Sequence, residues 1–242
     1  MTTISKVRTG VFCLTLLVAW SAASLSASAP PAREKVNDRG EFVLIFAGHE
    51  IGKESFEIET KRDKIEASAR IDLRMQQDGK TVELRSFPRL VMTPELTPVS
   101  YEWSQKGAQS SHLEVSFEAS RLTAKYHTVN GEDDVREFEL PRDLVILDNN
   151  VIHHYQIIAL KYLRAGGGEK TFRAFIPQEA LPGSLTIEDA GSDRVDVGGR
   201  EKLLKRLLVT TDNARIDLWI DNENRLQKIA IPAGQLEVYR KK

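Results

Sequence analysis

The chain has 242 residues and a balanced charge, with 34 Lys and Arg against 35 Asp and Glu and a formal net charge of −1. Nucleic-acid binding normally needs a basic face or stripe, and the sequence contains no long block of one charge sign. Composition therefore argues against a nucleic-acid partner. Cys13 is the only cysteine. It lies in the N-terminal apolar segment, so the rest of the chain offers no disulfide, thiol nucleophile or cysteine ligand.

The first segment has the pattern of a secretory signal peptide. Lys6 and Arg8 precede an apolar run over residues 10–20, and small residues follow up to Ala29. The run is shorter than the roughly 20 apolar residues of a membrane span. We expect residues 1–29 to be a signal peptide, 30–40 a mobile leader and 41–242 a single β-rich domain without a membrane span, in the periplasm or secreted. A retained N-terminal anchor is the alternative.

From residue 41 onward, short apolar runs alternate with turn residues. Phe56 and Ile58 alternate with acidic neighbours, which is the two-residue period of a half-buried strand. The dipeptides Asp78-Gly79 and Asn130-Gly131 each stand between two such runs. Both dipeptides favour tight turns, so they predict antiparallel hairpins.

Two passages depart from this simple pattern. Pro88, Pro94 and Pro98 remove ladder donors, so they predict an irregular passage or a sheet edge after Phe87. The run EKLLKRLL fits either a helix or a strand. We favour a strand over residues 205–211, because turns and strands flank it on both sides.

These elements predict a mainly β protein of about a dozen strands with one α-helix at about 150–164. Neighbouring strands joined by short turns pair antiparallel. A long meander of this kind twists and curls. We expect it to form a half-barrel or barrel with the helix packed on or in it.

The predicted helix follows the polar triplet Asp148, Asn149 and Asn150. Asp and Asn are preferred N-cap residues, because their side-chain oxygens accept free N–H groups of the first turn. The residues after the triplet present a broad apolar stripe at helical spacing, which predicts a face packed against the sheet. The triplet therefore predicts an ordinary helix cap.

His153 and His154 are adjacent, so on a helix they point about 100° apart and cannot chelate one ion together. Zinc ligands on a helix need i, i+4 spacing, and the remaining histidines His49, His112 and His127 lie on separate strands or turns. We expect no metal site and no cofactor. A hydrolase using Asp148 with His154 is an alternative function, although its nucleophile is missing from the motif.

Ile157 and Leu160 lie on the helix face opposite the apolar stripe. A helix that is apolar on two faces is buried on two sides or lines a cavity. This pattern favours binding of an apolar ligand in the hollow of the sheet. The candidate ligand-binding residues are Trp103, Tyr155, Ile157, Leu160 and Trp219, and we expect no catalytic residue.

Two segments carry a resemblance to known proteins. GHEIGKESFEI over residues 48–58 and IDLWIDNENRLQKIAI over residues 216–231 resemble an uncharacterised family of secreted bacterial proteins built as one antiparallel meander. That architecture is similar to the half-barrel of the periplasmic lipoprotein carriers. The resemblance implies the fold and an envelope location, and it suggests lipid binding. The sequence departs from lipid-modified members because no cysteine follows the signal segment.

We therefore expect a periplasmic or secreted binding protein without catalytic activity, which holds a lipid or another apolar ligand in a curled sheet. A structural or partner-binding protein of the envelope, without a small-molecule ligand, is the alternative.

Overall fold

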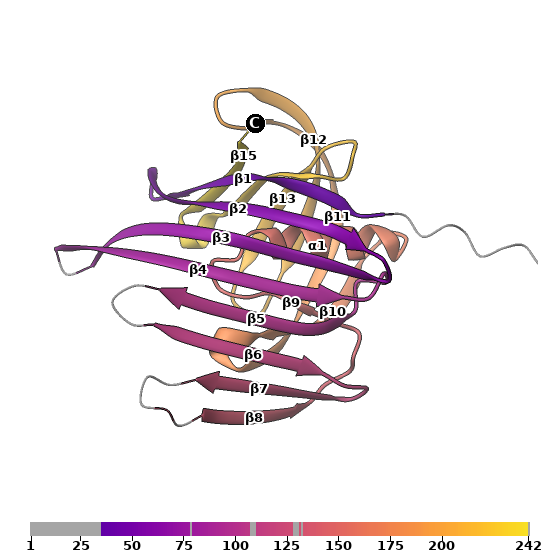
Figure 1. The fold of residues 1–242 in the computed structure, drawn as a ribbon. Coiled ribbons are helices and arrows are strands. Elements are labelled where there is room, and N and C mark those ends of the chain that lie inside the picture. Colours follow the sequence, from indigo (N-terminus) through magenta and orange to yellow (C-terminus); the bar gives the residue numbers. More distant parts are fainter. Residues whose placement is uncertain (1–34, 78, 107–109, 128–130, 132, 242) are drawn as a thin grey trace, which may run out of the picture. The chain divides into compact units, whose positions relative to one another are not determined.

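Fifteen strands form one sheet in a computed structural model that describes residues 35–241, apart from 78, 107–109, 128–130 and 132 (Figure 1). The segment expected to be a signal peptide lies outside the described residues, as do Asp78 and Asn130 of the expected turns. The strands are β1 (Asn37–Phe46), β2 (His49–Lys61), β3 (Lys64–Gln77), β4 (Lys80–Met92), β5 (Pro98–Lys106), β6 (Ser111–Phe117), β7 (Arg121–His127), β8 (Asp133–Glu139), β9 (Leu144–Ile146), β10 (Lys170–Ile176), β11 (Leu181–Asp196), β12 (Glu201–Thr210), β13 (Arg215–Ile220), β14 (Leu226–Ile231) and β15 (Leu236–Lys241).

The strand order places the two ends of the chain in the middle of the sheet. From one free edge to the other, the order runs from β8 back to β1, then to β15, and back from β15 to β9. Strand β1 pairs antiparallel with β15, with Phe42 opposite Arg240. Two meanders, one from each half of the chain, therefore meet at this β1–β15 seam.

The α-helix α1 (His153–Arg164) connects β9 to β10, and these two strands form the one parallel pair described in the sheet. Parallel neighbours need a crossover connection, and a helix commonly supplies it. Two short 3₁₀ helices, η1 (Pro177–Glu179) and η2 (Pro232–Gly234), form the β10–β11 and β14–β15 turns. No helix within the described residues is long and apolar enough to cross a membrane.

The sheet curls without closing, and α1 lies in its hollow (Figure 1). The curl brings the β10–β11 turn back to β7, where the Tyr126 hydroxyl donates to the carbonyl of Pro177 at 2.7 Å. Burial raises the pKa of Tyr126 to about 12, which keeps this donor protonated. The mainly β antiparallel meander with one helix is confirmed.

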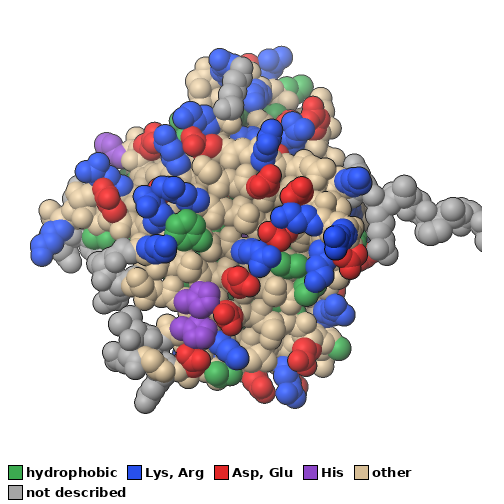
Figure 2. Space-filling view, in the orientation of Figure 1, with side chains coloured by type: hydrophobic (Ala, Val, Ile, Leu, Met, Phe, Trp, Pro, Cys, Tyr) green, Lys and Arg blue, Asp and Glu red, His purple; other side chains and the backbone are tan. Residues whose placement is uncertain are grey.

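One apolar core fills the hollow between the concave face and α1. Alternation along β2 decides which side chains enter it: Phe56 and Ile58 are buried, whereas Glu57 and Glu59 point outward. On the outer face of the sheet Lys and Arg are interspersed with Asp and Glu (Figure 2). The hairpins predicted at Asp78-Gly79 and Asn130-Gly131 are confirmed by the pairing of β3 with β4 and of β7 with β8.

Two sequence predictions need correction and one is confirmed. The expected irregular passage is found only between β4 and β5, where Pro94 lies, and Pro98 begins β5. Pro88 does not break the chain, because β4 runs through it and pairs it with Trp103. The ladder to β3 lapses beside Pro88, between Ser86 and Arg89. Strand β1 begins at Asn37, inside the expected leader. Strand β12 includes EKLLKRLL, so the prediction of a strand there in place of a helix is confirmed.

Candidate functional site

The helix α1 is buried on almost every side, because the sheet curls around it. Its buried side chains include five that carry polar groups, His153, His154, Gln156, Lys161 and Tyr162. A buried polar group is costly unless it has a hydrogen-bond partner. The partners of His153, His154 and Gln156 therefore show how the start of the helix is held.

Glu54 of β2 holds the start of the helix. Its fully buried carboxylate accepts the backbone N–H groups of Ile152 and His153 at 2.6 and 2.7 Å, and the Nδ1 of His153 lies 2.9 Å away. A negative charge at this position also meets the positive end of the helix dipole. The prediction that Asp148, Asn149 or Asn150 caps the helix is wrong, because no side chain of the N-terminal turn makes the cap bond.

Asp148 instead fixes the chain that leads into the helix. Its carboxylate accepts the Tyr101 hydroxyl at 2.6 Å and the backbone N–H groups of Asn149 and Gln178 at 3.0 Å each. Burial raises the pKa of Asp148, and these hydrogen bonds oppose the rise. Burial and the neighbouring Asp148 charge raise the pKa of Tyr101 well above its ordinary value. Tyr101 therefore remains a hydrogen-bond donor.

His154 is held by the backbone. Its Nδ1 accepts the N–H of Asp148 at 3.2 Å, so in the neutral ring the proton sits on Nε2. Burial and the adjacent His153 lower its pKa well below the usual range. The Asp148 carboxylate is not among its hydrogen-bond partners within the described residues. This geometry weighs against the Asp148–His154 hydrolase, because a general base needs an orienting partner and access to substrate.

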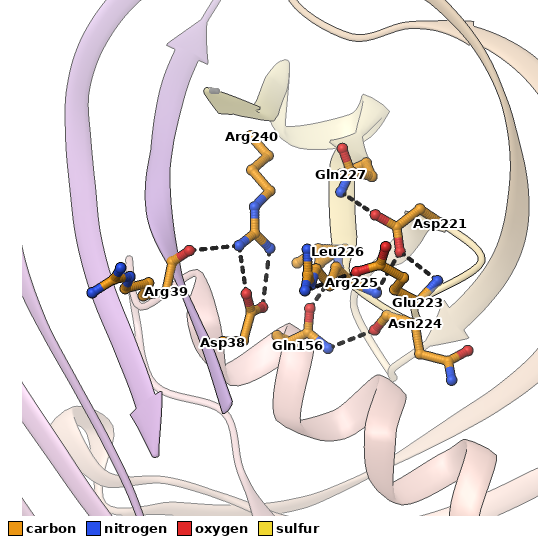
Figure 3. Close-up of polar contacts among 10 residues, drawn as sticks. All are labelled: Asp38, Arg39, Gln156, Asp221, Glu223, Asn224, Arg225, Leu226, Gln227 and Arg240. Carbon is orange, nitrogen blue, oxygen red and sulfur yellow. Dashed lines mark hydrogen bonds and ion pairs between the residues drawn. The ribbon is translucent and has the colours of Figure 1, made fainter. Parts of the chain in front are cut away.

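Gln156 joins the helix to the edge of β14 (Figure 3). Its Nε2 donates to the carbonyl of Asn224 at 2.8 Å, and its Oε1 accepts the N–H of Leu226 at 2.5 Å. The close-up also shows the guanidinium of Arg240 in β15 donating two hydrogen bonds to the carboxylate of Asp38 in β1 across the seam, at 2.5 and 3.0 Å. The helix is thus bonded to β2 on one side of the seam and to β14 on the other.

A groove of about 620 Å³ opens beside the start of the helix, on the side of β10 to β15. Its buried apolar lining consists of Val151, Ile152, Ala174, Leu185, Ile216 and Ile229. Leu181, which is 45% exposed, lines it as well. Gly183 of β11 also lines the groove, and a Cβ placed on it would have no atom within 4 Å. The groove therefore has an apolar floor and free space.

The five predicted ligand-binding residues do not share one cavity. Tyr155 borders the groove of about 620 Å³, where burial raises its pKa to about 12. Leu160 borders a second groove of about 360 Å³ with a largely polar lining. Ile157 and Trp103 pack in the main core. Trp219 belongs to a separate cluster with Val197 and Leu204.

Sequence reasoning missed two of the residues that build this site. Glu54 has the same parity along β2 as Phe56 and Ile58, and Tyr101 has the same parity along β5 as Trp103. An acid on the apolar face of an alternating strand is a signal of a buried polar contact. Its partner His153 is 99 residues away, and nothing in the local sequence identifies it.

Comparisons with known proteins bear on the fold. No protein-family model matches the chain, and no curated protein matches it by sequence. The crystal structure of a β-barrel-like protein of the domain of unknown function DUF1849 from Brucella abortus is similar to it, with a TM-score of 0.56 and 11% identity over 85% of this chain and 95% of that chain. A DUF1089 family protein from Pseudomonas aeruginosa has a TM-score of 0.46 and 11% identity over 75% and 90% of the two chains. At such identity the likeness to the DUF1849 protein shows a shared barrel-like fold.

Proposed function

We propose that the protein is a non-catalytic binding protein of the periplasm or the extracellular space, which holds the apolar part of a lipid in the groove at the start of α1. The groove itself carries the proposal. Its volume of about 620 Å³ lies within the range of about 300–1,000 Å³ typical of ligand pockets. Most of its buried lining is apolar, and the buried acid Asp148 in that lining already has hydrogen-bond partners, so an acyl chain there would leave water without stranding polar groups.

The polar residues of the groove indicate which lipids fit it. Of its described lining residues none is Lys or Arg, whereas Glu179 and Asp212 are exposed acids and Asn149 and Asn213 are exposed amides. A strongly anionic headgroup would meet like charge there. We therefore propose a neutral or zwitterionic headgroup in preference to an anionic one.

The buried polar groups near the groove have structural roles in this proposal. Glu54, Asp148 and His154 fix the start of α1, and Val151 and Ile152 of that same segment line the groove. The N-terminal pattern of Lys6, Arg8 and the following apolar run supports the envelope location.

Native mass spectrometry of the protein isolated from its envelope fraction, followed by solvent extraction, tests the proposal. We expect a defined extra mass that extracts as a neutral or zwitterionic lipid. The stripped protein should then bind a fluorescently labelled phosphatidylcholine probe, and unlabelled zwitterionic lipid should displace it better than anionic lipid.

Gly183→Phe tests the location of the ligand. The new ring enters the free space of the groove, so we expect probe binding to weaken by about tenfold or more, which corresponds to about 1.4 kcal/mol. Leu203→Phe is the matched control, because Leu203 is exposed and does not line the groove. A bare polypeptide mass, or equal binding by Gly183→Phe and the natural protein, would contradict the proposal.

A partner-binding protein without a small ligand is the second candidate. The observation that favours it is the free edge strand β8, whose Val135 is 51% exposed. Unpaired edge strands offer backbone donors and acceptors to another chain. A bare mass together with crosslinks from β8 to an envelope protein would favour this function.

A further inference from the structure

Two histidines that are far from the groove meet on the outer part of the sheet. His112 of β6 lies directly opposite His127 of β7, and Glu114 stands two residues after His112, on the same side of β6. The two imidazole rings are stacked, with centroids 5.0 Å apart and an angle of 23° between the planes. A pair of histidine side chains beside acidic ones is visible on the exposed face (Figure 2).

The donor atoms of these three residues converge. One ligand atom from each of His112, Glu114 and His127 lies within 4.8 Å of the others. The Nε2 of His112 is 3.0 Å from one oxygen of Glu114, and the Nε2 of His127 is 3.9 Å from the other. Metal–ligand bonds of about 2.0–2.1 Å in a tetrahedron place ligand atoms about 3.3 Å apart. Small side-chain movements would therefore bring the three ligand atoms to the separations that a tetrahedral ion requires.

Asp133 of β8 orients one of the two rings. Its carboxylate lies 2.8 Å from the Nδ1 of His127, so it accepts a hydrogen bond from the Nδ1–H group and leaves the lone pair on Nε2. That Nε2 is buried and makes no hydrogen bond within the described residues. A histidine whose second nitrogen is held by a carboxylate is the usual arrangement of a metal ligand.

We propose that His112, Glu114 and His127 bind a divalent transition-metal ion such as Zn²⁺, with Asp133 orienting His127. Imidazole nitrogens and a carboxylate suit zinc, and a water molecule would complete the coordination. An exposed His–Glu ion pair alone would not need the Asp133 carboxylate on the far nitrogen of His127. All four side chains are partly exposed, so an ion enters directly from solvent.

The proposed site departs from the expectation of no metal ion. His112 and His127 lie on separate strands in the sequence, but the register of the β6–β7 hairpin places them opposite each other. The bound ion would join β6 to β7 next to the free edge of the sheet.

Titration with Zn²⁺ alone tests the site in protein without a histidine tag, by isothermal titration calorimetry. We expect saturable binding of one ion per chain. Co²⁺ provides a measurement that needs no variant: four-coordinate binding would give visible absorption bands that Zn²⁺ displaces.

Variants locate the ion. His112→Ala and His127→Ala should each weaken binding by about 100-fold or more, and Asp133→Asn by about 10- to 100-fold, as for other groups that orient a metal ligand. His49→Ala is the matched control, because His49 is exposed on β2 and should leave binding unchanged. The affected side chains are on the surface, so circular dichroism should show an intact sheet in every variant.

The proposal is overturned if no saturable binding occurs. It is also overturned if His112→Ala and His127→Ala both bind Zn²⁺ like the natural protein, or if His49→Ala abolishes binding. Loss of affinity in Asp133→Asn together with both histidine variants supports it.

Discussion

The carboxylate of Glu54 does for α1 what an N-cap side chain does elsewhere, but it comes from a strand 98 residues before the first N–H that it accepts. A cap from the helix's own sequence stabilises the helix wherever it lies. A cap from β2 stabilises it only when it is docked in the sheet. The bonds of Glu54 therefore couple helix formation to tertiary structure.

Removing Glu54 should loosen the start of the helix. Glu54→Ala leaves the N–H groups of Ile152 and His153 buried without an acceptor, so we expect the free energy of unfolding to fall by about 2–4 kcal/mol. Urea unfolding followed by circular dichroism measures this. Glu57→Ala, at an exposed position of the same strand, should change the free energy of unfolding by about 0.5 kcal/mol or less. Equal effects of the two substitutions would contradict this role of Glu54.

His154 gives the protein a pH-dependent stability. Its folded pKa is depressed by burial, so below about pH 6.5 the unfolded chain binds a proton that the folded protein does not. The stability that neutral His154 contributes is present above that pH and is lost as pH falls. Asp148, whose pKa is raised, acts in the opposite direction: its contribution is present at acid pH and is lost as pH rises through its folded pKa.

Unfolding measured at pH 7, 6 and 5 checks the contribution of His154. We expect its part of the free energy of unfolding to fall by up to about 1.4 kcal/mol per pH unit below its unfolded pKa. His154→Asn keeps an acceptor for the Asp148 N–H but does not titrate, so its pH dependence should be shallower. His49→Asn should retain the slope of the natural protein, and a common slope for all three proteins would argue against His154 as its source.

The helix as an element is held at two points on different halves of the sheet. Glu54 holds its start to β2, and Gln156 holds its next turn to the chain at β14. Each contact satisfies backbone groups, and the N–H groups of Ile152, His153 and Leu226 among them belong to buried residues. The helix therefore acts as a brace between the two meanders.

Gln156→Leu should remove the hydrogen bonds that join α1 to the start of β14. The carbonyl of Asn224 and the N–H of Leu226 lose their partners, so we expect a loss of about 1–3 kcal/mol in the free energy of unfolding. Hydrogen exchange should become faster at the amide of Leu226 than in the natural protein. The amide of Ile229, in the same strand but not bonded to Gln156, is the internal control. Unchanged exchange at Leu226 would show that Gln156 does not hold this strand.

Elements whose signals are local could be predicted from the sequence, and contacts between distant elements could not. Asp78-Gly79 and alternating apolar residues predict a hairpin, because turn chemistry and side-chain period act within a few residues. Tracing the β6–β7 hairpin outward from its turn would have paired His112 with His127. The bonds from Glu54 to His153 and from Tyr101 to Asp148 depend on the curl of the sheet, which no local pattern specifies.

At the scale of the whole molecule, the β1–β15 seam decides whether the two meanders unfold together. The described residues contain one tryptophan in each half, Trp103 in β5 and Trp219 in β13. Each strand described in the sheet is hydrogen-bonded to its neighbours, including β1 to β15 at the seam. We therefore expect one cooperative transition.

Single-tryptophan variants of residues 30–242 measure this cooperativity. Trp103→Phe reports on Trp219, and Trp219→Phe reports on Trp103, by fluorescence during urea unfolding. The two probes are compared within one variant, so the effect of the substitution on stability cancels. In each variant, fluorescence and circular dichroism should give the same urea midpoint. A fluorescence midpoint that differs from the circular dichroism midpoint would show that the meanders unfold separately.

The seam also sets an order of events during synthesis. Arg240 and Asp38 are 202 residues apart, so β1 leaves the ribosome long before the strand that covers its second edge. The meander from β1 to β8 can form locally as it emerges, whereas the seam must wait for β15. Until then β1 is an open edge, and its Asp38, Arg39 and Glu41 place charges where another nascent chain would otherwise add a strand. The same residues that later close the sheet thus protect the unfinished chain from aggregation.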